Sequence, residues 1–237
     1  MHAIILAGGK GERLRPFTNN RPKGMVKVEG KPILEYQINW LKQYGVTEII
    51  FACGYKHEVI KEYFEDGKKF SLKISYSIEE NPLGRGGGVK KAWEKIKNNE
   101  PIIVTNGDVY TDMDLERAIQ AHKEQNKKHG TIATICLFPY KSPYGIVRFG
   151  ENGIVESFEE KRALPFWVNG GIYIFEHEVK DYLPVTGDHE TTTFQELAAK
   201  KLIYAYKSID YWKGIDTVKD LKEFIYEKKM LSVECVE

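Results

Sequence analysis

The chain has 237 residues, 42% of them hydrophobic, so it can bury one sizeable core without being forced to divide into two domains. Lysine and arginine number 35, against 34 aspartates and glutamates. This balance excludes a bulk electrostatic field that would hold nucleic acid or an anionic membrane surface, so anionic ligands must be bound by local charge.

Short β-rich apolar segments alternate with amphipathic segments through the first half of the chain. The predicted strands are 2–6, 48–53, 72–78 and 101–106, and the predicted helices are 32–44, 58–65, 88–97 and 115–127. Such alternation predicts an α/β fold with a mostly parallel, Rossmann-like central sheet and helices on both faces.

After Gly130 several strands follow one another without intervening helices. They are predicted at 131–140, 145–150, 153–161 and 166–175, before helices at 193–200 and 217–229 that flank a strand at 203–209. This succession favours an antiparallel or mixed extension of the sheet. No Pro- or Ser-rich linker divides the sequence, so 1–237 is predicted to form one domain with halves 1–128 and 129–237.

Cysteine and histidine usage gives no sign of disulfides or zinc. Cys53, Cys136 and Cys235 form no CxxC pair, and the six histidines have no zinc-binding spacing. A sparse, odd number of cysteines is typical of a reducing compartment. The apolar start is too short for a signal peptide, and nowhere do 18 apolar residues run together. We therefore expect a soluble, cytoplasmic protein without a membrane partner.

A glycine-rich segment directly follows the first predicted strand. Gly8, Gly9 and Gly11 lie at the carboxyl edge, where open α/β sheets bind ligands. Backbone amides there can approach a phosphate, and Arg13 adds positive charge. The dinucleotide pattern GxGxxG is incomplete because Leu14 holds the place of the third glycine, and the Walker A pattern is absent. The segment favours a phosphate-binding loop, with a tight turn as the alternative.

Asp108 follows another apolar strand, in the sequence Thr-Asn-Gly-Asp at 105–108. It is expected at the same sheet edge as the glycine loop. A carboxylate facing phosphates needs a cation between them, and Mg²⁺ is commonly held by one or two carboxylates plus phosphate oxygens. The alternative is a turn aspartate without a ligand.

Two segments together, LAGGKGERLRPFT and RPKGMVKVEGKPILEYQ, resemble the signature of the sugar-1-phosphate nucleotidylyltransferases. The resemblance continues through NGD at 106–108, FEEK at 158–161 and VNGGIY at 168–173, and covers residues 3 to 224. It implies a Mg²⁺-dependent enzyme that joins a nucleoside triphosphate to a sugar 1-phosphate and releases pyrophosphate. It also implies a nucleotide-binding first half, a sugar-phosphate-binding second half and a homo-oligomer.

The resemblance implies a role for each matching residue. Arg13 would stabilise the β- and γ-phosphates, Lys23 the α-phosphate, and Asp108 would bind Mg²⁺. The expected nucleotide-binding residues are Leu6, Gly8, Gly9, Gly11, Glu80, Leu83 and Gly84. The expected sugar-phosphate-binding residues are Gly145, Glu160, Lys161, Asn169 and Gly170. Asp216 is the expected second metal ligand, with the alternative that Asp216 or Thr217 simply caps the last helix.

Substrates and activity stay open on the residues alone. The glycine loop and NGGIY favour guanylyl transfer to a mannose- or heptose-type phosphate, whereas GIDT at 214–217 favours cytidylyl transfer to glucose 1-phosphate, and thymidylyl or uridylyl transfer is a further alternative. Departures from the family pattern at Gly24, Arg85 and Gly214 leave a catalytically silent, nucleotide-sugar-binding homologue as a competing hypothesis. A nicotinamide oxidoreductase is the third, weakened by the incomplete glycine pattern.

Overall fold

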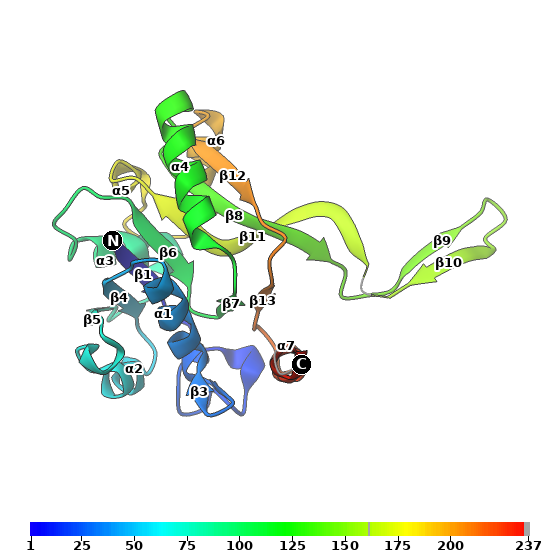
Figure 1. Ribbon diagram of the computed structural model, residues 1–237, viewed down its shortest axis with the longest axis horizontal. Helices are drawn as coiled ribbons and strands as arrows, with labels where there is room; N and C mark the ends of the chain where they lie inside the picture. The colour runs from blue at the N-terminus through cyan, green and yellow to red at the C-terminus, as the bar shows by residue number, and fades with distance from the viewer. Residues whose placement is uncertain (161, 235–237) are drawn as a thin grey trace.

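The centre of the fold is a seven-stranded sheet built from the apolar segments of both halves of the chain (Figure 1). The computed structural model describes residues 1–160 and 162–234. The strand order across the sheet is β12-β8-β11-β6-β1-β4-β5. In chain order these strands are β1 (His2–Leu6), β4 (Glu48–Cys53), β5 (Lys73–Ile78), β6 (Ile102–Asn106), β8 (Ala133–Lys141), β11 (Ala163–Phe175) and β12 (Ile203–Lys207).

The strands that the first half contributes to the main sheet are all parallel, and the second half makes the sheet mixed. β1 pairs in parallel with β4 and β6, and β4 pairs in parallel with β5. β11 is antiparallel to both of its neighbours, β6 and β8, while β12 is parallel to β8. The predicted fold class, a mostly parallel sheet with a mixed extension, is therefore confirmed.

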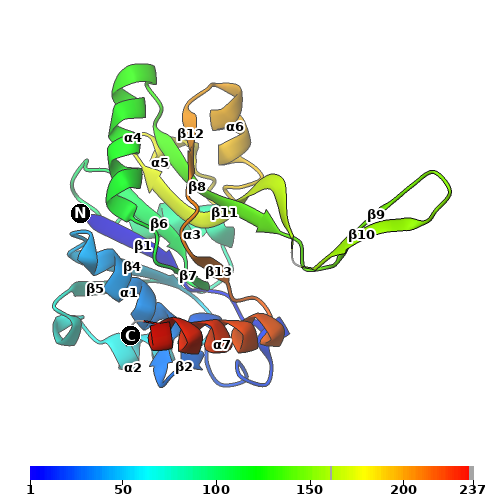
Figure 2. The ribbon, with the colours of Figure 1, turned by 45° about the vertical axis from the view of Figure 1, so that its right-hand side comes forward.

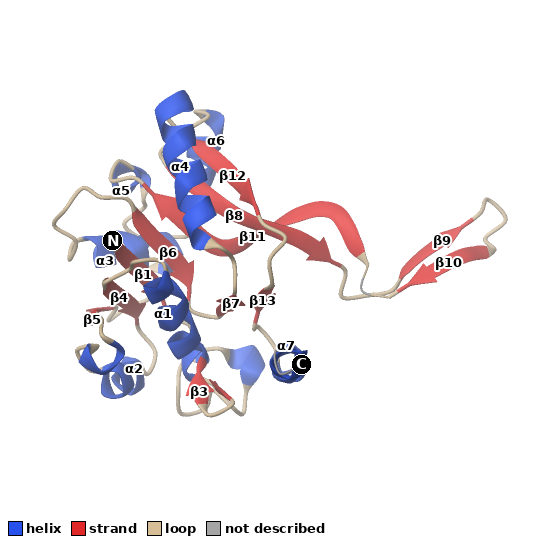
Figure 3. Cartoon of the chain, viewed as in Figure 1, coloured by secondary structure: helices blue, strands red, loops and turns tan. Residues whose placement is uncertain are grey.

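Helices cover both faces of the sheet (Figure 3). Alternation along β1 sends Ile5 into one core cluster with Ile38 and Phe64, and sends Ile4 into a second cluster with Trp93 and Phe194. The helices that supply these clusters are α1 (Ile33–Gln43), α2 (His57–Phe64) and α4 (Leu115–His129) on the first face, and α3 (Gly84–Trp93), α5 (Val179–Tyr182) and α6 (Thr193–Ala199) on the second.

Helix α3 begins four residues before the predicted start at Gly88. Three consecutive glycines, 86–88, disfavour a helix by intrinsic propensity, which favours a start no earlier than the last of them. Packing reverses this preference. A Cβ at Gly86 would lie 2.7 Å from Pro184 Cγ, and one at Gly87 would lie 2.5 Å from the Val185 carbonyl oxygen. The glycines let the first turn of α3 lie directly against the segment that follows α5.

Several short elements lie outside the main sheet. They are η1 (Glu12–Leu14), η2 (Lys23–Met25), β2 (Lys27–Val28), β3 (Lys31–Pro32), η3 (Lys68–Phe70), β7 (Val109–Thr111), the hairpin strands β9 (Ile146–Phe149) and β10 (Val155–Glu159), β13 (Trp212–Gly214) and α7 (Val218–Glu234). A third core cluster joins α7 to the chain after β1 through Leu14, Val26, Ile215 and Phe224. The sequence did not predict β7 or β13, because three-residue strands carry little periodicity.

Cys53 and Cys136 lie in β4 and β8 as free, buried thiols, and burial raises the pKa of each to about 12. Within residues 1–160 and 162–234, no helix is long and apolar enough to cross a membrane.

Candidate active site

The glycine loop and the Asn-Gly-Asp turn meet at the carboxyl ends of β1 and β6. Leu6 lies opposite Asn106 in the register of the two strands. The Gly107 amide donates a hydrogen bond to the Leu6 carbonyl at 2.8 Å, and a Cβ at Gly107 would lie 2.6 Å from that oxygen. Only glycine allows this close approach, which places Asp108 beside the end of β1.

The glycine loop folds against the side chain of Lys23. Gly11 has φ +64°, and a Cβ there would lie 3.0 Å from both Lys23 Cβ and Thr18 Cγ2. The Thr18 hydroxyl donates to the Gly11 carbonyl at 2.8 Å. Gly8 and Gly9 have no such constraint, because the nearest atom to a Cβ at Gly8 is 3.5 Å away and nothing lies within 4 Å of one at Gly9. Gly11 is therefore structural, whereas Gly8 and Gly9 leave the loop open toward solvent.

Four charged side chains predicted from separate segments converge at this edge. Lys23 Nζ lies 2.6 Å from Asp108 Oδ2 and 2.5 Å from Asp216 Oδ1, and Arg13 Nη2 donates to the same Asp216 oxygen at 2.9 Å. The Lys23 side chain is 13% exposed, but those of Asp108 and Asp216 are 32% and 48% exposed. Burial raises the pKa of Asp216, and the bond and charge of Lys23, with the charges of Arg13 and Arg85, outweigh it and hold that pKa below its usual value.

Asp216 reaches Asp108 through the pairing of two short strands. β13 runs antiparallel to β7 with Gly214 opposite Val109, and the Ile215 amide donates to the Asp108 carbonyl at 2.9 Å. This pairing brings together two carboxylates that lie far apart in the sequence.

The start of α7 is capped by Thr217 rather than by Asp216. The Asp220 amide donates to Thr217 Oγ1 at 3.2 Å, and Asp220 Oδ2 accepts the Thr217 amide at 2.8 Å, a reciprocal capping box. The predicted alternative of a cap by Asp216 or Thr217 is therefore met by Thr217, and Asp216 does not cap the helix. Its carboxylate is turned to Lys23 and Arg13 instead.

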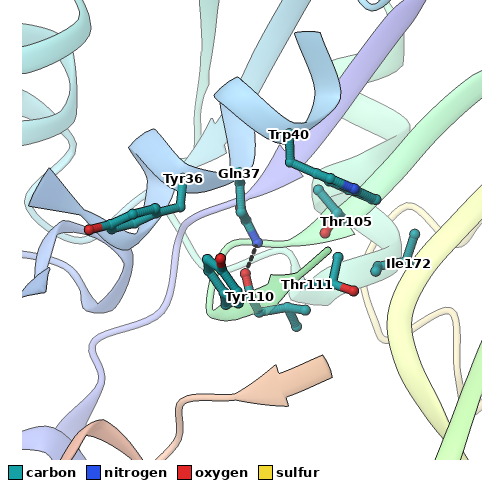
Figure 4. Close-up of a pocket in the computed structure, with 8 residues that line it drawn as sticks. Tyr36, Gln37, Trp40, Thr105, Tyr110, Thr111 and Ile172 are labelled. Atoms are coloured by element: carbon teal, nitrogen blue, oxygen red, sulfur yellow. Dashed lines mark hydrogen bonds between the residues drawn. The ribbon is translucent and has the colours of Figure 1, made fainter. Parts of the chain in front are cut away.

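A buried glutamine on α1 fixes the chain on both sides of Asp108. Gln37 is 4% exposed, and its Nε2 donates to the carbonyls of Asn106 at 2.6 Å and Val109 at 2.7 Å. Figure 4 shows Gln37 reaching from α1 toward β7, in a pocket also lined by Trp40. Sequence reasoning missed Gln37; the available signal was a polar residue on the apolar face of an amphipathic helix.

The segment with the expected nucleotide-binding residues Glu80, Leu83 and Gly84 is held by hydrogen bonds within the chain. The Leu83 amide donates to Glu79 Oε2 at 3.0 Å, and the Leu83 carbonyl accepts the Gly187 amide at 2.7 Å. Gly84 has φ +76°, and a Cβ there would lie 2.7 Å from the Gly187 carbonyl oxygen. The predicted Glu80 is exposed, so it is Glu79 that braces the loop.

The first backbone amides of α3 are bonded within the chain. The amide of Arg85 donates to Asp188 Oδ1 at 2.9 Å, and those of Gly86 and Gly87 donate to the Gly187 carbonyl at 2.9 and 3.2 Å. The segment between α5 and α6 thus occupies the donors that a phosphate would need.

Glu190, which sequence reasoning missed, connects the two halves of the site. Its Oε2 accepts Arg85 Nη1 at 2.6 Å, while its Oε1 lies 3.2 Å from both Asn169 Nδ2 and the Tyr173 hydroxyl. Asn169 Oδ1 accepts the Gly171 amide at 2.9 Å, which fixes the side chain. The predicted Asn169 is therefore held in a network that begins at Arg85 on the nucleotide side.

The other residues expected to bind the sugar phosphate lie apart from this network. Gly170 packs against Phe138, and its carbonyl accepts Trp212 Nε1 at 2.8 Å. Gly145 and the exposed Glu160 flank the β9–β10 hairpin, and no hydrogen bond or ion pair between described residues joins them to the Lys23 cluster. Lys161 lies outside the described residues.

No group of three or more histidine, cysteine, aspartate or glutamate side chains that could enclose a metal occurs among the described residues. Asp108 and Asp216 nevertheless form a two-carboxylate donor set. That set fits Mg²⁺, which takes one or two protein carboxylates and completes its coordination with water and phosphate oxygens.

Comparisons with known proteins agree with this geometry. The nucleotidyl transferase family profile matches residues 2–229. A D-glycero-alpha-D-manno-heptose 1-phosphate guanylyltransferase of Campylobacter jejuni is 36% identical over 95% of this chain and 99% of its own length. A UTP–glucose-1-phosphate uridylyltransferase of Synechocystis is also 36% identical over 93% of this chain, but the match spans only 61% of that longer protein.

Solved structures share the fold. HddC from Yersinia pseudotuberculosis superposes with a TM-score of 0.72 at 26% identity, covering 95% of this chain and 98% of HddC. A putative glucose-1-phosphate thymidylyltransferase from Bacillus anthracis reaches a TM-score of 0.73 at 20% identity, a likeness of fold alone. With the profile match and the full-length relative, these results show that the chain belongs to the sugar-1-phosphate nucleotidyltransferase family.

Proposed function

We propose that the protein transfers a nucleotidyl group from a nucleoside triphosphate to a sugar 1-phosphate and releases pyrophosphate. The observation that carries this proposal is the convergence of Arg13, Lys23, Asp108 and Asp216 at the carboxyl edge of the parallel strands. The convergence also argues against a catalytically silent homologue, since a protein that only bound nucleotide sugar would not need both cations and both carboxylates there.

The reaction needs placement and charge compensation rather than an activated nucleophile. The phosphate oxygen of the sugar phosphate is already ionised at neutral pH, so neither a histidine base nor a serine nucleophile is required. Lys23 is assigned to the charge that develops on the α-phosphate, and Arg13 to the β- and γ-phosphates of the leaving pyrophosphate. Asn169, held by Glu190, is assigned to a sugar hydroxyl.

Asp108 and Asp216 are the residues that would hold Mg²⁺. When bound, the ion would neutralise phosphate charge as a Lewis acid. In its absence the Lys23 ammonium holds the two carboxylates together, which keeps the donor set assembled. The proposal also assigns nucleotide binding to residues 1–128 and sugar-phosphate binding to residues 129–237. Asp216 is the residue of the second half that would contribute to the metal site.

Guanylyl transfer to a D-glycero-D-manno-heptose or mannose 1-phosphate is the proposed specificity. The relative matched over its whole length is a heptose 1-phosphate guanylyltransferase, and several relatives at 34–35% identity are mannose-1-phosphate guanylyltransferases. The HddC structure has also been obtained complexed with GMP-PN. Because both substrates are phosphorylated metabolites, a cytoplasmic location is expected.

A substrate screen tests the proposal. Purified protein is incubated with each of the four nucleoside triphosphates and dTTP against heptose, mannose and glucose 1-phosphates, with pyrophosphate release as the readout and EDTA as the metal control. We expect release with GTP and a manno-configured sugar phosphate, abolished by EDTA and by Lys23→Met. Release with another pair would overturn the specificity, and no release with any pair would overturn the enzymatic function.

A further inference from the structure

Arg85 lies in the first turn of α3, directly after the expected nucleotide-binding residues Leu83 and Gly84. It is one of the positions that depart from the family pattern, so the resemblance assigns it no role. Its Nη1 donates to Glu190 Oε2 at 2.6 Å, and its Nε lies 3.5 Å from Asp188 Oδ1. A side chain of the nucleotide half therefore holds two carboxylates of the sugar-phosphate half.

The backbone around Arg85 is bonded to the same segment. α3, α5 and α6 cover one face of the sheet (Figure 2), and a loop joins α5 to α6. In this loop the Gly187 carbonyl accepts the amides of Gly86 and Gly87 at 2.9 and 3.2 Å. The Gly187 amide donates to the Leu83 carbonyl at 2.7 Å. The start of α3 and the loop are therefore held together as one unit.

Glu190 connects Arg85 to Asn169. Its Oε1 lies 3.2 Å from both Asn169 Nδ2 and the Tyr173 hydroxyl, and Asn169 Nδ2 donates to that hydroxyl at 3.0 Å. Tyr173 is fully buried, and burial raises the pKa of its hydroxyl, which stays a neutral donor to the carboxylate. Both amide hydrogens of Asn169 are then engaged. Asn169 Oδ1 accepts the Gly171 amide and has a second lone pair for a sugar hydroxyl.

We propose that Arg85 is a positioning residue for the sugar phosphate, because by holding Glu190 against Asn169 it makes the sugar-phosphate site depend on the nucleotide-binding segment. A nucleotide bound at Leu83 and Gly84 fixes the start of α3 and with it the Arg85 side chain. Asn169 is then already oriented when the sugar phosphate arrives, so the two substrates bind with positive cooperativity. This inference rests on the proposed function, from which it takes both substrates.

The exposure of the ion pair suits it to this task. The Arg85 and Glu190 side chains are 45% and 27% exposed, and pairs at such positions contribute little to the stability of the whole fold. Two arrangements that differ little in free energy can be shifted by a ligand that favours one of them. Without Arg85, the carboxylates of Asp188 and Glu190 lose the cation that contacts both, and their repulsion favours a Glu190 that turns to water and releases Asn169.

Steady-state kinetics separates positioning from a general structural role. The substrates are the pair that the screen identifies, expected to be GTP and mannose 1-phosphate. Arg85→Met and Glu190→Gln should each raise the KM for the sugar phosphate roughly 10-fold, while the KM for the triphosphate stays within about twofold. The double variant should be no worse than either single variant, because both changes break the same contact. Arg85→Lys keeps the charge and should recover part of the loss.

Arg117→Met is the matched control. Arg117 also lies in the first turn of a helix, α4, and its Nε lies 3.2 Å from Asp114 Oδ2. Its removal should leave both KM values unchanged. Unfolding midpoints of the Arg85 and Glu190 variants should also match the wild type, because their ion pair is partly exposed.

Calorimetric titration measures the cooperativity without turnover. Mannose 1-phosphate, or the sugar phosphate that the screen identifies in its place, is titrated into the free protein. The same titration is repeated with protein saturated with Mg²⁺ and the α,β-methylene analogue of the triphosphate, in which the bond to the leaving pyrophosphate cannot be broken. We expect roughly fivefold tighter binding of the sugar phosphate to the saturated wild type, and equal binding in the two states of Arg85→Met.

Three results would overturn the inference: equal increases in both KM values, additive losses in the double variant, or the same sugar-phosphate affinity with and without the analogue. An absence of pyrophosphate release with every substrate pair would overturn the proposed function instead, and the titrations would still decide the cooperativity. A sugar phosphate that binds in neither state would overturn both.

Discussion

Replacing Lys23 by methionine keeps the length of the side chain but removes the only charge between Asp108 and Asp216 that contacts both. Because both carboxylate oxygens contact one nitrogen, at 2.6 and 2.5 Å, they lie at most about 5 Å apart. Two unit charges at that separation repel by about 3 kcal/mol at an effective dielectric constant of 20. Since the carboxylates are 32% and 48% exposed, screening by water reduces the expected loss of stability to about 1–2 kcal/mol.

Mg²⁺ should reverse that loss. In the wild type the ammonium already neutralises the carboxylates, so Mg²⁺ must displace it and should stabilise the free protein only weakly. In Lys23→Met the ion meets a pair whose remaining cation is Arg13 at Asp216, and a concentration ten times its dissociation constant would stabilise the fold by about 1.4 kcal/mol. Turnover should fall on the order of 100-fold or more in the same variant, because charge on the α-phosphate is no longer compensated.

Urea unfolding followed by circular dichroism, in EDTA and in a series of Mg²⁺ concentrations, measures both effects. Asp216→Asn in the Lys23→Met background is the control, since it removes the repulsion and should abolish the extra Mg²⁺ response. The reasoning is refuted if Lys23→Met matches the wild type in EDTA, or if Mg²⁺ raises the unfolding midpoints of both proteins equally.

Three further variants or conditions probe the supports of the site. Gly24→Ala should lower the free energy of unfolding in urea by about 1–3 kcal/mol, because its Cβ would lie 2.7 Å from the Gly107 carbonyl oxygen and from Leu34 Cγ. Gly9→Ala is the control and should be near neutral. Equal unfolding midpoints for the two variants would contradict the expected clash at Gly24. Gln37→Met removes the side-chain amide that donates to the carbonyls of Asn106 and Val109, so it should cost about 1–3 kcal/mol and lower kcat. Unchanged unfolding and turnover would rule out its positioning role. Burial lowers the pKa of His122 and of His189 from 6.5 to about 4. Between these pH values the unfolded chain therefore binds more protons than the folded protein. The free energy of unfolding should consequently fall as the pH falls from about 6.5 to 4. His189→Phe should flatten this dependence in urea titrations, and an unchanged slope would refute the assignment.

Secondary structure was largely predictable from local patterns. EIIFAC reads as a buried strand and forms β4 at the predicted residues, and most other strand and helix boundaries differ by a few residues. Propensity failed at the first turn of α3, where Gly86 and Gly87 are helical because only they fit beneath the segment after α5. The prediction failed there because the deciding atoms, at Pro184 and Val185, are about a hundred residues away.

Three of the four residues of the charged cluster sit in short segments with a chemical signature, whereas Asp216 was expected only from the family resemblance. Arg13 follows a glycine loop, Lys23 follows proline, and Asp108 follows a strand and a glycine. Strand polarity explains why two of these segments meet, since the carboxyl ends of parallel neighbours share one edge.

The tertiary structure alone decided how the remaining groups are used. Asp216 is in the site because β13 pairs with β7 and Thr217 takes over the helix cap. Glu190 reaches its partners across the fold and leaves no local pattern, and Gln37 leaves only a polar position on the apolar face of α1. Local sequence sets the backbone and the chemistry of each segment, but hydrogen-bond partners across the sheet depend on register and packing, which arise only when distant segments fold together.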